Sequence, residues 1–138
     1  MCGISSFIGD ENAYRKILDG LLQLQNRGYD SAGISIFENG NIITHKYASS
    51  TNSSALDKLE KYNYENNHVG IGHTRWATHG AKTDTNSHPH MSFNERFVLV
   101  HNGIIENFQE IKTFLAGKGI SCISQTDTEV IVNLLAYY

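Results

Sequence analysis

Long hydrophobic runs are missing from this sequence. No apolar stretch approaches the roughly 18 residues that a membrane-spanning helix needs. The first residues also lack the basic segment and following apolar segment of a secretory signal peptide. We therefore expect a cytoplasmic protein with no membrane partner. Internal repeats, low-complexity tracts and linkers are missing too, so the 138 residues predict one globular domain.

An excess of positive charge is also missing. The chain has 11 Lys and Arg against 14 Asp and Glu, and the basic residues are scattered along it. Such a chain offers no continuous basic surface to phosphates, so we expect no nucleic-acid partner. Cysteine is scarce, because Cys2 and Cys122 are the only two. Without a secretion signal we expect both to be free thiols.

The apolar residues that are present predict a mixture of helices and strands. Helical spacing over residues 14–22 predicts a first helix, with Asp10 as its cap and Gly28 at its end. Alternating patterns on both sides of Asn39–Gly40 predict a β-hairpin. The remaining pattern predicts a short surface helix at 53–61, strands at 68–76, 96–103 and 120–124, a long polar loop at 78–95, and a helix at 107–116.

A last helix is predicted after the sequence Thr-Asp-Thr-Glu. Thr126 and Glu129 have the spacing of a capping box, in which each side chain binds a backbone N–H of the first turn. The helix then runs to Tyr137 and Tyr138 without a closing glycine or a following strand.

Cys2 is the first residue with an apparent chemical purpose. It could simply be a small apolar residue near the start of the chain. Alternatively, removal of Met1 would leave a thiol beside its own α-amine, whose pKa of roughly 7.7 to 8 lets it act as a base near neutral pH. The second reading makes Cys2 an N-terminal nucleophile.

Three other stretches carry polar residues suited to a site. Arg75 follows a predicted strand, and its planar guanidinium can bind a carboxylate through two hydrogen bonds. Asn102 and Gly103 could form an oxyanion hole from a side-chain amide and a backbone N–H. Asp127 could hold an ammonium group. Taken singly, each has an ordinary alternative: a solvated loop for Arg75, an Asn-Gly turn for Asn102 and Gly103, and an acid that complements the helix dipole for Asp127.

The seven histidines give only weak evidence for a metal site. None of them forms a pair at the helical i, i+4 spacing, and no second cysteine lies near Cys2. We therefore expect no metal and no cofactor.

Six stretches occur together in an order that resembles one family. The stretches are MCGI, NRGYDSAGISI, GIGHTRWATHG, NSHPH, VHNGIIENF and SQTDTEVI. They resemble the glutaminase domains of class II glutamine amidotransferases, which use an N-terminal nucleophile, and within that family those of the glucosamine-6-phosphate synthases.

This resemblance implies a role for each matching residue. Cys2 matches the nucleophile, and Asn102 with Gly103 matches the oxyanion hole. Arg75 matches the group that binds the α-carboxylate of glutamine, and Asp127 the group that binds its α-ammonium. The remaining matches are Thr78 and His79 beside the carboxylate, Trp76 as a shield for the intermediate, and Arg27 with Gly28 as support for the Cys2 region.

The implied fold is an α+β, four-layer αββα sandwich of the Ntn-hydrolase type. Because the resemblance covers 1–138 and only somewhat more than half of such a glutaminase domain, we expect an incomplete domain, truncated at its C-terminal side. The sugar isomerase domains would be absent. Open sheet edges then favour self-association, or a partner chain that carries the missing strands and the sugar-phosphate domains.

The resemblance implies hydrolysis of the side-chain amide of L-glutamine through a γ-glutamyl thioester on Cys2. The ammonia released would normally be transferred to fructose 6-phosphate to make glucosamine 6-phosphate. Two alternatives stay open: a non-catalytic remnant that binds glutamine or a partner protein, and an amidase that acts on another amide.

Overall fold

A computed structural model describes residues 2–24, 30–76 and 80–138 of the chain. These residues form six strands and four helices. In chain order they are β1 (Gly3–Ile8), α1 (Ala13–Leu24), β2 (Ser31–Glu38), β3 (Asn41–Ala48), α2 (Ala55–Glu60), β4 (Asn67–Arg75), β5 (His90–Met91), β6 (Val98–Leu99), α3 (Phe108–Gly117) and α4 (Thr128–Tyr137).

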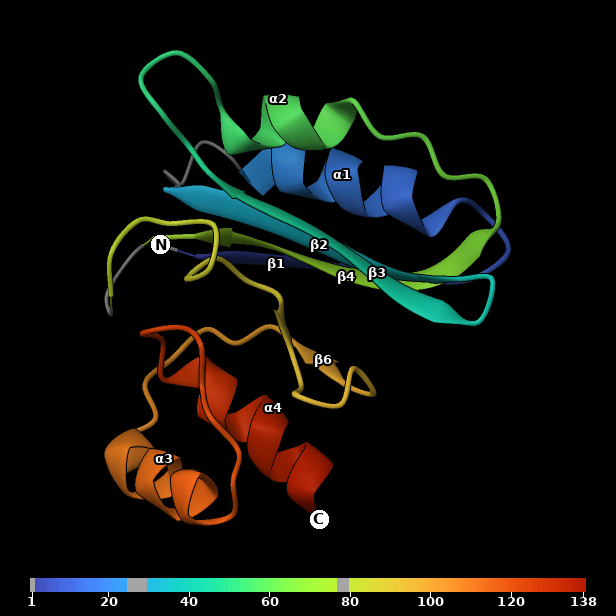
Figure 1. The fold of residues 1–138 in the computed structure, drawn as a ribbon. Coiled ribbons are helices and arrows are strands. Elements are labelled where there is room, and N and C mark those ends of the chain that lie inside the picture. The colour runs from blue at the N-terminus through green and yellow to red at the C-terminus, as the bar shows by residue number, and fades with distance from the viewer. Residues whose placement is uncertain (1, 25–29, 77–79) are drawn as a thin grey trace.

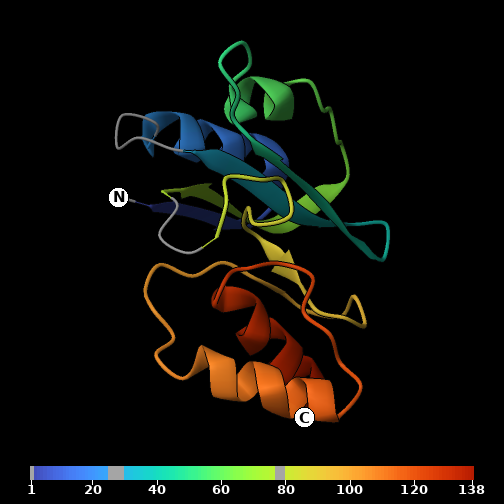
Figure 2. The same cartoon turned by 60° about the vertical axis from the view of Figure 1, so that its left-hand side comes forward.

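The elements are arranged in layers (Figures 1 and 2). Helices α1 and α2 cover one face of an antiparallel sheet with the strand order β1-β4-β2-β3. The β5-β6 pair lies beyond the other face, followed by α3 and α4. This order of helix, sheet, sheet and helix confirms the expected αββα architecture.

The first helix forms where the apolar spacing predicts it, but its cap differs from the prediction. The side chain of Asn12 accepts a hydrogen bond from the Arg15 N–H at 3.0 Å, whereas Asp10 is exposed and lies outside the first turn. Asn12 is therefore the cap, because only a residue directly before the helix can reach its unpaired N–H groups. The predicted end at Gly28 lies outside the described residues.

Helix α1 lies very close to the centre of the sheet because β4 carries two glycines on the face beneath it. A Cβ atom added at Gly72 would lie 2.4 Å from Ile17, and one added at Gly70 would lie 2.8 Å from the same side chain. Apolar residues of α1, α2 and β2 fill the space between these layers and form the main core.

The predicted hairpin is confirmed. Strands β2 and β3 pair from Ser31–Ala48 to Glu38–Asn41, and both Asn39 and Gly40 have positive φ angles, as a tight turn of this kind requires. The predicted strand at 68–76 is confirmed as β4, and the predicted helices at 53–61 and 107–116 as α2 and α3. Helix α2 is more than a surface helix, because Leu56 and Leu59 are fully buried.

Other boundary predictions are wrong. Residues 120–124 form no strand, and only Val98–Leu99 is a strand within 96–103. The capping box is also absent: Asp127 directly precedes α4, and the Glu129 carboxylate accepts hydrogen bonds from the N–H groups of Ile123 and Ser124. This carboxylate is therefore bound by backbone N–H groups that precede the helix, not by those of its first turn.

The polar loop predicted at 78–95 contains β5 and is partly buried against the sheet. Gly33 makes this approach possible, since a Cβ atom there would lie 2.1 Å from the His88 carbonyl oxygen. Lys46 holds the loop from β3, because its ammonium donates to the carbonyls of Thr85 at 3.3 Å and Ser87 at 2.9 Å. Burial lowers the Lys46 pKa to about 8.

In the part of the chain that the structure describes, no helix is both long enough and apolar enough to cross a lipid bilayer.

Substitution of the helix cap tests the corrected assignment. Asn12→Ala should lower the free energy of unfolding by about 1 kcal/mol, because an N–H of the first turn of α1 loses its acceptor. The matched variant Asp10→Ala should change it by less than about 0.5 kcal/mol, as is usual at exposed positions. Urea unfolding measures both values. A larger loss in Asp10→Ala than in Asn12→Ala would contradict the assignment.

Candidate active site

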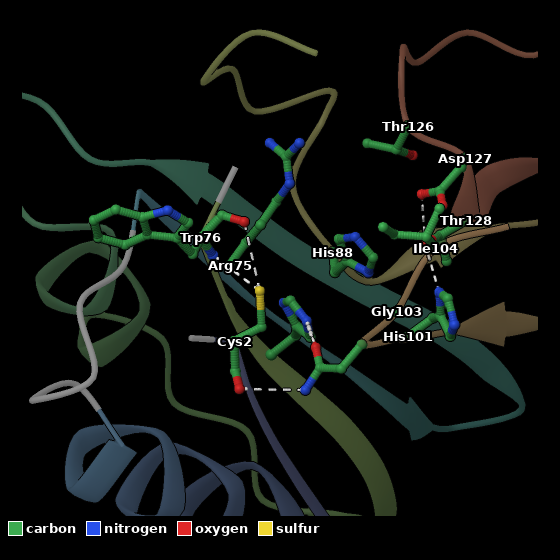
Figure 3. Close-up of a pocket in the computed structure, with 12 residues that line it drawn as sticks. Cys2, Arg75, Trp76, His88, His101, Gly103, Ile104, Thr126, Asp127 and Thr128 are labelled. Atoms are coloured by element: carbon green, nitrogen blue, oxygen red, sulfur yellow. Dashed lines mark hydrogen bonds between the residues drawn. The ribbon is translucent and has the colours of Figure 1, made fainter. Parts of the chain in front are cut away.

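The described residues that the sequence singled out for chemistry meet in one pocket of about 380 Å³. Its walls come from the start of β1, the end of β4, the segment after β6 and the start of α4 (Figure 3). The sequence-predicted residues among its lining are Cys2, Arg75, Trp76, Asn102, Gly103 and Asp127. Thr78, His79, Arg27 and Gly28 lie outside the described residues.

Strand pairing places the nucleophile candidate. Gly3 pairs with Thr74 across β1 and β4, so Cys2 and the end of β4 lie at the same edge of the sheet. The Cys2 Sγ accepts a hydrogen bond from the Trp76 N–H at 3.1 Å, and it lies 3.5 Å from the Trp76 carbonyl oxygen. The thiol is therefore held at the pocket by backbone contacts.

Asn102 lies next to Cys2. Its Nδ2 donates to the Cys2 carbonyl oxygen at 3.3 Å, and its Oδ1 lies 2.7 Å from His73 Nε2. Gly103 follows with a φ of 152°, and a Cβ atom there would lie 2.8 Å from His101 Nε2. This backbone therefore favours glycine for both conformation and space.

Two opposite charges lie in the pocket wall. Arg75 is 4% exposed, and burial lowers the pKa of its guanidinium, against the opposing effect of Cys2, Asp30 and Asp127. Asp127 is 5% exposed, and its Oδ2 accepts a hydrogen bond from the Ile105 N–H at 2.7 Å. A carboxylate has about four lone-pair sites, so Asp127 can accept further donors from a ligand. Together the two groups suit a molecule that carries both charges.

Trp76 lies at the rim of the pocket. Its side chain is 51% exposed, and the indole ring extends away from the side on which Asp127 lies (Figure 3). An exposed tryptophan costs hydrophobic free energy, which a ligand or a moving loop would recover by covering it.

Three buried imidazoles form a column, and two of them line the pocket. His73 and His88 stack at 4.3 Å between ring centroids, and His88 meets His90 edge-on at 4.7 Å. Burial lowers the pKa of His73 to about 4 and of His90 to about 3, and it lowers the pKa of His88 still further. All three are therefore neutral near pH 7. Among the described residues, no group of histidines, cysteines and acids is arranged to hold a metal ion.

His73 and His88 line the pocket, yet the sequence pattern gave them no role. One signal could have found His73: it lies two residues before Arg75 on β4, so both side chains are on the same face of the strand. No comparable signal exists for His88, because its position depends on the path of a loop.

The cysteines are both free in the described chain, as expected. They differ in environment. Burial raises the pKa of the Cys122 thiol, which is not among the residues that line the pocket. Cys2 is the thiol that the pocket presents.

A family model described as a glutamine amidotransferase domain matches residues 56–138. Curated relatives named glutamine--fructose-6-phosphate aminotransferase [isomerizing] match all of this chain. The protein of Caldanaerobacter subterraneus subsp. tengcongensis is 52% identical, that of Staphylococcus aureus 49%, and that of Clostridium perfringens 45%. The chain spans 22% of the length of each of these relatives.

Two solved structures have a similar fold. One is glutamine phosphoribosylpyrophosphate amidotransferase from B. subtilis complexed with ADP and GMP, with a TM-score of 0.75. The other is described as the allosteric regulatory enzyme of purine biosynthesis, with a TM-score of 0.77. Each is 28% identical to this chain, and each match covers 98% of this chain and 29% of the other.

The buried imidazoles predict that the fold weakens in mild acid. A histidine whose pKa is lower in the folded state binds fewer protons there than in the unfolded state. The free energy of unfolding is therefore highest above pH 6.5 and falls as the pH drops toward about 4. Each histidine contributes up to about 1.4 kcal/mol per pH unit. Urea unfolding across this range measures how steeply the free energy of unfolding falls with pH. His90→Gln should make this slope smaller by the contribution of one histidine. An unchanged slope in that variant would count against the assignment.

Proposed function

The chain belongs to the glutamine amidotransferase domain family, and from that premise we propose that it hydrolyses the side-chain amide of glutamine through a thioester on Cys2. One observation carries this proposal: the Cys2 thiol shares a pocket with Arg75 and Asp127, a buried cation and a buried anion. Glutamine carries both charges at its α-carbon and an amide at the other end.

The proposed reaction begins with removal of Met1, which exposes the α-amine of Cys2. This amine takes the thiol proton, and Sγ attacks the Cδ carbonyl carbon of glutamine. The negative charge that develops on the amide oxygen is stabilised by Asn102 Nδ2 and the Gly103 N–H. The tetrahedral intermediate collapses, the C–N bond breaks, and the proton held by the amine leaves with ammonia.

Water completes the cycle. The α-amine accepts a proton from water, and the resulting hydroxide attacks the thioester carbonyl, which the same two donors polarise. The C–S bond then breaks, glutamate leaves, and the proton returns to Sγ. Each turnover consumes one glutamine and one water, and it releases one glutamate and one ammonia.

Substrate recognition is assigned to the two charged residues. We assign Arg75 to the α-carboxylate, with Thr78 and His79 beside it, and Asp127 to the α-ammonium. Trp76 is assigned to shield the thioester intermediate from water. Arg27 with Gly28 is assigned to support the Cys2 region. The 52% identity to a curated relative over the whole chain supports these assignments.

We further propose that the ammonia is used to aminate fructose 6-phosphate. The relatives' names state this substrate, and the chain spans 22% of their length. The acceptor would therefore bind to another part of the same protein or to a partner chain. A cytoplasmic location would suit this chemistry, since it keeps the Cys2 thiol reduced.

Labelling of the nucleophile tests the proposed function. A glutamine analogue with an electrophilic γ-carbonyl group should add once, at Cys2, and intact mass measures the adduct. Cys122 is the internal control, because its raised pKa leaves little thiolate. Cys2→Ala should lose the adduct and glutamate release together, and a form that retains Met1 should release no glutamate. Glutamate release by Cys2→Ala at the wild-type rate would refute the mechanism.

Matched analogues test the two charged residues. Glutaminamide lacks the α-carboxylate and N-acetylglutamine lacks the α-ammonium, so both should be poor substrates of the wild-type chain. Arg75→Lys should lower kcat/KM for glutamine roughly 30-fold or more. It should reduce the preference for glutamine over glutaminamide and leave the preference over N-acetylglutamine unchanged. Asp127→Asn should erode the discrimination against N-acetylglutamine only. Equal turnover of glutamine and both analogues by the wild type would favour a broader amidase.

A further inference from the structure

We propose that His73 is a positioning residue for the oxyanion hole: it donates a hydrogen bond to Asn102 Oδ1 and so directs the Asn102 amide hydrogens toward Cys2 and the substrate. This inference rests on the proposed function, because it assigns a task to Asn102 in that reaction. It adds a residue that lines the pocket but acts through Asn102 and is not itself a donor to the substrate.

The orientation of the Asn102 amide follows from its neighbours. The atom that faces Asn102 from Cys2 is a backbone carbonyl oxygen, which can only accept a hydrogen bond. The amide must therefore present Nδ2 to Cys2 and Oδ1 to the other side. On that side, at 2.7 Å, lies His73 Nε2.

The proton on His73 is then fixed as well. Oδ1 of an amide is an acceptor only, so the ring nitrogen that faces it must carry hydrogen. The ring is neutral near pH 7, because burial lowers its pKa to about 4, and a neutral imidazole carries one proton. His73 is thus the Nε2–H form, which agrees with its buried Nδ1 having no hydrogen-bond partner among the residues that the structure describes.

The ring itself is held rigidly. His73 is fully buried on the central strand β4, and the ring of His88 stacks on it at an interplanar angle of 18°. Asn102, in contrast, is exposed and lies on a segment without regular structure. The buried partner can therefore orient the exposed one.

This orientation matters because an Asn amide that rotates by half a turn presents oxygen instead of N–H. An oxygen directed at the developing oxyanion would repel it. With His73 in place, one Nδ2 hydrogen binds the Cys2 carbonyl and the other is available to the substrate oxygen. Preorganised donors of this kind account for about 100-fold to 1000-fold in kcat.

Kinetics on the full chain test the proposal. His73→Leu should lower kcat for glutamate release about 10-fold or more, because part of the oxyanion-donor effect is lost, with KM within about 2-fold of wild type. His73→Gln keeps an N–H donor at this position and should recover most of kcat. Tyr14→Phe is the control for general destabilisation, since it removes a buried 2.7 Å hydrogen bond to the Leu59 carbonyl outside the pocket.

A double variant separates positioning from a structural effect. If His73 acts through Asn102, then His73→Leu combined with Asn102→Ala should be no slower than Asn102→Ala alone, within about 2-fold. Multiplied losses would overturn the proposal, as would a loss in His73→Leu confined to KM. Equal losses in Tyr14→Phe and His73→Leu would also overturn it.

The tautomer of His73 gives a test that needs no activity and no variant that folds poorly. Nitrogen-15 NMR of the wild-type chain should find Nε2 protonated and Nδ1 unprotonated at neutral pH, and a protonated Nδ1 would overturn the proposal. A wild-type chain that releases no glutamate would count against the proposed function instead. Normal turnover with a protonated Nδ1 would count against the His73 inference alone.

Discussion

The antiparallel pairing of β1 with β4 is the constraint on which the site depends. It fixes Gly3 opposite Thr74, so that Cys2 lies beside the residues that follow β4. A shift of one residue would move every side chain of the strand to the other face. Phe7 of β1 packs against the main core, and His73 and Thr74 of β4 are fully buried, so burial opposes such a shift. The glycines of β4 let α1 pack directly on it. The thiol position therefore follows from the packing of the whole first layer.

The second layer supplies the remaining groups of the site at an energetic cost. Polar residues of the loop between β4 and β5 are buried against the sheet, where unpaired polar groups are expensive. Lys46 offsets part of this cost by donating to loop carbonyls, and the imidazole column does so by remaining neutral. The same burial keeps Arg75 and Asp127 in a region of low dielectric constant, where their charges act strongly on a ligand.

The sequence by itself determined the local structure and the chemical inventory. The Asn39–Gly40 turn, the apolar face of α1 and the strand that became β4 depend on neighbouring residues only, and they formed as predicted. The six described residues named as candidates line one pocket, because the order of the motifs carries family information that single residues lack. The predicted layer order came from the same resemblance.

Only the tertiary structure decided which distant groups meet. Glu129 has the spacing of a cap but binds backbone N–H groups before its helix, and Asn12 rather than Asp10 caps α1. His73 meets Asn102 across 29 residues of sequence. Such hydrogen bonds depend on strand register and on the path of loops. These are fixed by burial across the whole fold, and no local pattern records them.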